Sequence, residues 1–268
     1  MTTCPDDVLA LAAELAEIGR EVTLSHFRQD VAVESKDDAS PVTIADRRSE
    51  ELMRERIARQ FPDHGVVGEE YGPSNPGASH QWVIDPVDGT NRFASGHPQF
   101  GCLIALLRDN RPILGIIDMP ALDERWTGAL GHPTTFARHG ERSTVRARPC
   151  DGLASASLFF GSGNMVRPEF RTALDALRTR ARFALYDGDC YAYGLVANGT
   201  ADVVADSNMG VYDYLPLVAV LEGAGAVITD WDGAALGLQS GGEALAAGDR
   251  GVHGAALELL QQAREMQK

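Results

Sequence analysis

Residues 82–93 read WVIDPVDGTNRF, and the interpretation of the whole chain starts from this stretch. A short run of strand character ends in Asp85, and Asp88 follows three positions later, directly before Gly-Thr. Two carboxylates this close repel each other unless a cation lies between them or one of them binds a proton. The stretch therefore predicts a metal site where a buried strand ends.

The Gly-Thr that follows Asp88 adds a second feature to this site. Glycine lets a ligand approach the backbone closely, and the amides of Gly89 and Thr90 at a helix start suit a phosphate oxygen. The structural alternative is an Asx-type turn, for which Asp-Gly is a common signal.

Length and composition exclude several classes of protein. The chain has 268 residues, 44% of them hydrophobic and 23% charged, with a formal net charge of −14. This acidity argues against a nucleic-acid partner, and no apolar run approaches the roughly 20 residues of a membrane span. Cysteines 4, 102, 150 and 190 form no CxxC pair. With no targeting segment evident, we expect a cytoplasmic protein with reduced thiols and no membrane partner.

The pattern of elements changes near residue 140. Helical spacing of apolar residues predicts helices over 6–28 and 46–60, and strands follow from 82 to about 137, with a hairpin at 108–112. Beyond about 150, strands at 157–161, 183–187, 202–206 and 226–231 are interleaved with helices expected over 168–180, 189–198, 213–224 and 254–267. We therefore expect an N-terminal α+β half, 1–140, with most metal ligands, and a C-terminal α/β half, 141–268, with Asp213 and the specificity residues.

Acidic residues also stand at the ends of other predicted elements. Thr43 and Asp46 are expected just ahead of a helix, Glu69 and Glu70 follow a β-branched run, and Asp213 is expected to precede a helix. Taken singly, these are a helix cap, a solvated acidic turn and a second helix cap. Taken together, clustered carboxylates without histidine or thiolate neighbours suit a hard cation such as Mg²⁺.

These motifs together resemble the inositol-monophosphatase-like superfamily of Mg²⁺-dependent phosphatases over nearly the whole chain. The resemblance implies a layered αβαβα sandwich of α+β and α/β character, and a homodimer. It implies that Glu69, Asp85 and the carbonyl of Val87 hold one Mg²⁺. Asp85, Asp88 and Asp213 would hold a second, and Glu69 would help to hold a third.

The resemblance also assigns catalytic and phosphate-binding roles. Asp46 and Thr90 would orient and deprotonate the attacking water, assisted by Glu69 as a metal ligand, and the amides of Gly89 and Thr90 would hold the phosphate. Asp88 and Asp213 would face the bound substrate. The implied reaction is hydrolysis of a small phosphate monoester by in-line attack of a metal-activated water.

Within the superfamily, the stretches YDGDCYAYGLVANGTADVV and YDYLPLVAVLEGAGAVITDWDG are similar to the histidinol-phosphate phosphatase branch. The resemblance implies L-histidinol phosphate as substrate, in histidine biosynthesis. Its cationic end calls for acidic groups, and we expect Asp189 and Asp206 to supply them, with a turn or cap role as the alternative for each. Asn91-Arg92 departs from the pattern of this branch.

Two other functions remain open from the sequence. An inositol monophosphatase, or a broad sugar or nucleotide phosphatase of the same superfamily, would use the same metal site with a pocket that hydrogen-bonds hydroxyl groups. A non-catalytic, metal-dependent binding protein would need the ligands alone, and the presence of both Thr90 and Asp46 argues against it.

Overall fold

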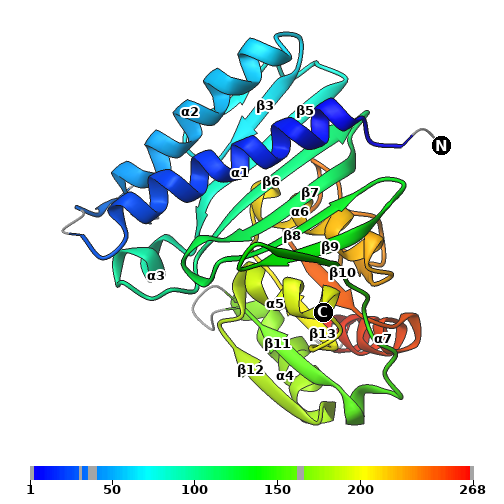
Figure 1. Cartoon of the computed structure of the whole chain (residues 1–268). Coiled ribbons are helices and arrows are strands. Elements are labelled where there is room, and N and C mark those ends of the chain that lie inside the picture. Colours follow the sequence, from blue (N-terminus) through cyan, green and yellow to red (C-terminus); the bar gives the residue numbers. More distant parts are fainter. Residues whose placement is uncertain (1–2, 30–31, 36–40, 162–165, 266–268) are drawn as a thin grey trace.

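The computed structural model describes residues 3–29, 32–35, 41–161 and 166–265. Within these residues two stacked sheets alternate with three layers of helices, which confirms the expected αβαβα sandwich. Figure 1 shows two long helices, α1 and α2, lying across the larger sheet, with the smaller sheet and the remaining helical layers beyond it. None of the described helices is long and apolar enough to cross a membrane.

The larger sheet is formed by consecutive segments of the first half of the chain. Among the described residues its eight strands lie in the order β10-β9-β8-β7-β6-β5-β3-β4. Only the β3–β5 pair is parallel in this described sheet. The bounds are Gly65–Gly68 (β3), Gly72–Ser74 (β4), His80–Asp88 (β5), Gly101–Arg108 (β6), Arg111–Met119 (β7), Glu124–Ala129 (β8), His132–Arg138 (β9) and Glu141–Thr144 (β10). Two short strands, β1 (Glu34–Ser35) and β2 (Pro41–Val42), pair separately.

The smaller sheet belongs to the second half of the chain. In the described residues it has five strands in the order β12-β11-β13-β15-β14, with β11 parallel to both neighbours and β15 antiparallel to both of its own. The bounds are Ser157–Phe160 (β11), Phe183–Tyr186 (β12), Val203–Asp206 (β13), Val227–Thr229 (β14) and Ala244–Ala247 (β15).

Helices cover both faces of each sheet. They are α1 (Asp6–His26), α2 (Ile44–Gln60), α3 (Thr90–Ala94), α4 (Arg171–Arg180), α5 (Asp189–Ala197), α6 (Val211–Gly223) and α7 (Arg250–Glu265). Successive side chains of a strand point to opposite faces of the sheet, so one strand contributes to the hydrophobic cores on both faces. On β6, Ile104 and Leu106 pack toward α1 and α2, whereas Leu103 and Leu107 pack toward α5 and α6. This explains why CLIALL reads as an unbroken apolar run.

Helix α6 lies in the middle layer and contacts both sheets through one shared core. It rests directly on the larger sheet at two glycines. A Cβ on Gly115 would lie 2.0 Å from the carbonyl oxygen of Pro216, and one on Gly128 would lie 2.2 Å from that of Ala219. Because a side chain at either position would collide with the helix backbone, these glycines determine how closely α6 approaches β7 and β8.

The expected elements correspond to observed ones with shifted ends. Helix 168–180 begins as a 3-10 turn over Pro168–Phe170, and helix 254–267 already begins at Arg250; its last two expected residues lie outside the described range. Strand β9 falls within the strand region expected to about 137, whereas β10 and β15 were not expected, because ERST is polar and ALAA is weak in strand character. The larger sheet ends at Thr144, and the domain boundary near 140 stays a prediction.

Candidate metal centre

Three aspartates from two elements meet where β5 ends. One carboxylate oxygen from each of Asp85, Asp88 and Asp213 lies within 4.8 Å of the others. A register shift between Asp85 and Asp88 interrupts the pairing of β5 with β6, and the amide of Val87 donates to Asp85 Oδ1 at 2.9 Å. This irregularity lets both aspartates of one strand contribute to the cluster, although they stand an odd number of residues apart.

The cluster is rich in negative charge. Burial, together with the charges of Glu69, Asp88 and Asp213, raises the pKa of Asp85 well above its usual range. Burial and the charge of Asp88 do the same to the pKa of Asp213, and burial and Asp189 raise the pKa of Asp88 to about 6. In the part of the chain that the structure describes, no arginine or lysine forms an ion pair with these three aspartates. Converging oxygen donors with unbalanced charge fit a hard divalent cation.

Asp213 belongs to the first turn of α6. The sequence placed it before the helix, but α6 begins at Val211, so that expectation was wrong. Asp213 Oδ2 accepts the amide hydrogen of Gly210 at 2.7 Å, as in a capping box. The cap and the metal-ligand interpretations are therefore compatible, since the same carboxylate caps the helix and reaches the cluster.

Glu69 lies directly after β3, next to the cluster. Its amide donates to the carbonyl of Ile84 at 3.2 Å, which places it level with the end of β5. Its side chain is close enough to Asp85 to contribute to the raised pKa of that residue. The predicted ligands thus lie close together where β5 ends: Glu69, Asp85, Asp88 and Asp213.

Asp46 and Thr90 lie beside this cluster in direct contact. The hydroxyl of Thr90 is 3.1 Å from Asp46 Oδ1 and 3.1 Å from the carbonyl oxygen of Val87, so it can donate to either. Asp46 Oδ2 accepts the amide of Thr43 at 2.9 Å and also its hydroxyl. Burial raises the pKa of Asp46, and the hydrogen bonds from Thr43 and Thr90 oppose this rise.

The start of α2 also differs from the sequence expectation. The helix begins at Ile44 with Thr43 as its N-cap, so Asp46 lies inside the first turn rather than ahead of it. Asp46 again serves two purposes, because it completes the capping box and holds Thr90. Gly89, with φ of 85°, takes the left-handed conformation that ends β5 and starts the short helix α3.

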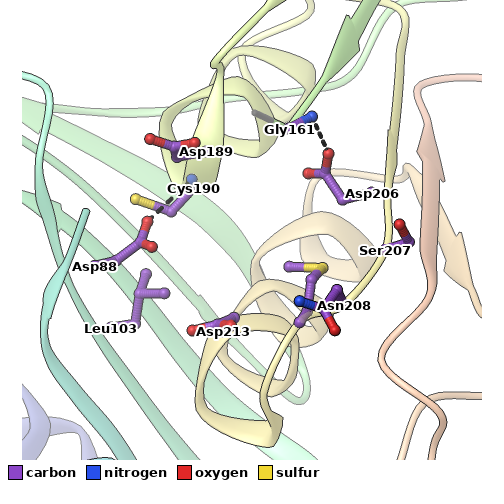
Figure 2. A pocket seen from close by; sticks show the side chains of 10 residues that line it. Asp88, Leu103, Gly161, Asp189, Cys190, Asp206, Ser207, Asn208 and Asp213 are labelled. Atoms are coloured by element: carbon purple, nitrogen blue, oxygen red, sulfur yellow. Dashed lines mark hydrogen bonds between the residues drawn. The ribbon is translucent and has the colours of Figure 1, made fainter. Parts of the chain in front are cut away.

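A cavity of about 90 Å³ opens beside Asp88 and Asp213. Figure 2 shows that Asp189 and Asp206 also line it, with Asp206 across the open space from Asp88. Asp206 is 6% exposed and accepts hydrogen bonds from the amide of Gly161 and, at 2.9 Å, from the hydroxyl of Tyr193. Burial raises the pKa of Asp206 to about 7, and these hydrogen bonds oppose the rise.

Asp189 has a cationic partner that the sequence did not reveal. Arg92 Nε lies 2.5 Å from Asp189 Oδ2, and Arg92 Nη2 donates to the carbonyl of Asp187 at 2.7 Å. The departure noted at Asn91-Arg92 therefore places an arginine against one of the two expected substrate-binding acids. Cys190 was also missed; its amide donates to Asp88 Oδ2 at 3.2 Å. Neither contact has a local sequence signal, because each joins residues about a hundred positions apart.

The chain is similar to known proteins over most of its length. A family model described as the inositol monophosphatase family matches residues 5–266. The bifunctional phosphatase IMPL2 of Arabidopsis thaliana is 41% identical over 96% of this chain and 75% of its own length. The histidinol-phosphatase of Mycobacterium tuberculosis is 37% identical, covering 85% and 89% respectively. A solved structure of an inositol monophosphatase from Zymomonas mobilis superposes with a TM-score of 0.86 at 38% identity, over 96% of this chain and 98% of its own.

Proposed function

The chain belongs to the inositol monophosphatase family and is a phosphatase, and we propose that it hydrolyses L-histidinol phosphate to L-histidinol and inorganic phosphate in histidine biosynthesis. The family is metal-dependent and acts on small phosphorylated substrates, and the acidic cluster of this chain agrees with that requirement.

The observation that carries the substrate assignment is the acidic far wall of the cavity. Asp206 lies beyond the cluster, on the side where a leaving group would project from a phosphate held at Asp88 and Asp213. Histidinol carries an ammonium group and an imidazole, which a carboxylate binds by charge-assisted hydrogen bonds. Because Asp189 is already paired with Arg92, Asp206 is the stronger candidate for this contact.

We infer that Mg²⁺ is the metal, with two or three ions held by Glu69, Asp85, Asp88, Asp213 and the Val87 carbonyl. When bound, the ions offset the negative charge of the carboxylates and phosphate and make water a better nucleophile. Thr90 donates to Asp46 Oδ1, so its hydroxyl oxygen can accept a proton from the attacking water. Asp46, buried and with a raised pKa, is suited to take up the proton that Thr90 passes on.

The remaining residues position the phosphate. The amides of Gly89 and Thr90 stand where β5 ends beside Asp88, and they would hold phosphate oxygens. Water attacks phosphorus, the bond from phosphorus to the histidinol oxygen breaks, and that oxygen gains a proton. One water is consumed for each histidinol and phosphate formed.

Phosphate release from a panel of monoesters in the presence of Mg²⁺ tests the substrate. The panel contains histidinol phosphate, inositol phosphates, fructose 1,6-bisphosphate and adenosine 3′,5′-bisphosphate. We expect the highest kcat/KM for histidinol phosphate. A preference for inositol phosphate would favour the second candidate function, which the 38% identity to the Zymomonas mobilis inositol monophosphatase supports.

Asp206→Asn tests the acidic wall directly. Asparagine keeps an acceptor oxygen for Tyr193 but removes the charge, so kcat/KM for histidinol phosphate should fall about tenfold, equivalent to about 1.4 kcal/mol. Glycerol phosphate, which has no cationic group, should be affected much less. Asp187→Asn serves as the control, because this carboxylate is 53% exposed and lies beside Arg92. Equal losses on both substrates would contradict the assignment.

A homodimer in the cytoplasm completes the proposal. The dimer rests on the family resemblance, and the location rests on the cysteine usage, which agrees with the free cysteines at 4, 102, 150 and 190. Light scattering at micromolar concentration should give twice the mass of 28.7 kDa. A monomeric mass would rule the dimer out.

A further inference from the structure

A carboxylate on α2 supports the turn that carries Glu69. Glu50 lies in the interior of this helix with its side chain 0% exposed. Its Oε2 accepts the amide hydrogen of Glu70 at 2.8 Å, and its Oε1 accepts that of Tyr71 at 3.3 Å. A buried carboxylate that accepts two consecutive backbone amides fixes the direction of the chain at that turn, because hydrogen bonds to a charged acceptor are strong and directional.

Arg54 completes this arrangement one helical turn later. Its Nε lies 2.7 Å from Glu50 Oε1, which compensates the buried charge. The other nitrogens of the same guanidinium donate to the carbonyl of Gly72 and, at 3.2 Å, to the hydroxyl of Ser74. Helix α2 is therefore hydrogen-bonded to the turn through Glu50, and to the following strand, β4, through Arg54.

The strand that precedes the turn leaves room for this contact. A Cβ on Gly68 would lie 1.9 Å from Glu50 Oε1, so only a bare backbone lets the carboxylate reach the turn. Immediately beyond Gly68, the amide of Glu69 bonds to the carbonyl of Ile84 on β5, one residue before Asp85. Glu69 is thus held on one side by β5 and on the other by the amides that Glu50 accepts.

We propose that Glu50 is a positioning residue for the metal centre: it holds the turn so that the carboxylate of Glu69 faces Asp85. Glu50 does not belong to the acidic cluster itself and acts through the backbone of residues 70 and 71. The proposal rests on the metal-dependent function proposed above. It predicts that loss of the Glu50 charge weakens metal binding more than it slows turnover once metal is bound.

Glu50→Gln is the direct test, with Mg²⁺ binding to metal-free protein measured by isothermal titration calorimetry. The amide group of glutamine offers one acceptor where two backbone donors and Arg54 need two. Because residues that orient metal ligands change affinity by about 10- to 100-fold when replaced, we expect Mg²⁺ to bind at least about tenfold more weakly. At saturating Mg²⁺ kcat should stay within about threefold of the unmodified enzyme, which separates positioning from a role in the chemical step.

Glu51→Gln is a matched control on the same helix. Glu51 is 50% exposed and forms a surface ion pair with Arg48, so neither Mg²⁺ affinity nor kcat should change. Unchanged Mg²⁺ affinity in folded Glu50→Gln would overturn the proposal. If Glu50→Gln does not fold, Glu50→Asp decides: it keeps a negative charge beside Arg54, but its shorter side chain cannot reach the amides of both Glu70 and Tyr71. A several-fold weakening of Mg²⁺ binding supports the proposal, and an unchanged affinity overturns it.

The measurements also separate this proposal from the function on which it rests. If the unmodified protein binds Mg²⁺ but prefers another phosphate ester, the substrate assignment fails and the comparison of Mg²⁺ affinities still stands. If the unmodified protein binds neither Mg²⁺ nor Mn²⁺, the metal centre itself fails before any variant is compared.

Discussion

Asp85 on β5 and Asp118 on β7 are buried acids of the same sheet with opposite surroundings. The side chain of Asp118 is 0% exposed, and its Oδ1 lies 2.6 Å from both Arg20 and Arg125. Asp85 is 2% exposed and faces Asp88, Asp213 and Glu69 instead. The protein supplies counter-charges where the acid serves the fold. Where the acids gather at the cavity, the balancing charge has to come from a ligand.

Asp85→Asn should have the largest effect on activity. It removes a carboxylate that we expect two metal ions to share, so turnover at saturating Mg²⁺ should fall by about three orders of magnitude or more. The variant should remain folded, because it also relieves repulsion within the cluster. Phosphate release at saturating Mg²⁺ measures turnover, and a thermal melt in excess chelator measures whether the variant is folded. Activity within tenfold of the unmodified enzyme would contradict a shared-ligand role.

Asp118→Asn should have the opposite effect, because it should reduce stability and leave kcat nearly unchanged. It removes the buried carboxylate that Arg20 and Arg125 share and leaves them only their exposed partners, Asp123 and Glu17. Removing one partner of a buried ion pair destabilises a protein by about 3 kcal/mol or more. Urea denaturation measures this loss, with kcat expected to change little below the unfolding transition. Asp123→Asn is the control: Asp123 also pairs with Arg20 but is 49% exposed, so less than about 1 kcal/mol should be lost.

Removing the metal should make stability depend on pH with a defined sign. The pKa of Asp88 is raised from 3.8 to about 6 on folding, first by burial and then by Asp189. Its contribution to stability is therefore fully present below about pH 4 and is lost as the pH rises through about 6. In chelator, the free energy of unfolding of the unmodified protein, measured relative to that of Asp88→Asn, should decrease between pH 5 and pH 7.5.

Adding Mg²⁺ should reverse that shift. Bound cations offset the ionised carboxylates, so the stabilisation by Mg²⁺ should be larger at pH 7.5 than at pH 5. Urea titrations at both pH values, with and without Mg²⁺, provide the measurement. An Mg²⁺ effect equal at the two pH values would show that the cluster is not the site where the ion binds.

The sequence predicted the acidic cluster better than its surroundings, for a physical reason. Asp85, Asp88 and Gly89 follow one another in a short motif, so local spacing alone indicates their chemistry. Asp46 and Asp213 were ambiguous between helix caps and functional residues, and the structure shows that such a carboxylate can cap a first turn and reach the site as well. Both carboxylates belong to capping boxes, as the cap interpretation implies, and their functional roles stay predictions.

The residues that the sequence did not reveal owe their positions to tertiary packing. Arg92 meets Asp189, and Asp118 meets Arg20, across roughly a hundred positions of the chain. A charged residue on a helix gives no local indication of its partner, since most such residues face solvent. Strand β15 was missed for a related reason: ALAA forms a strand because Val204 and Ile228 lie beside it, not because of its own propensity.

The close contact of α6 with Gly115 and Gly128 has a consequence for engineering this enzyme. Pro216, whose carbonyl meets Gly115, lies one turn beyond Asp213 on the same helix. An alanine at Gly115 must lift that turn away from β7, and Asp213 moves with it relative to Asp85. In a random mutagenesis library, substitutions at Gly115 should therefore reduce activity as substitutions of the metal-site residues do, and not as typical core substitutions do. Redesign of the active site would do well to leave the backbone bare there and vary the cavity wall instead.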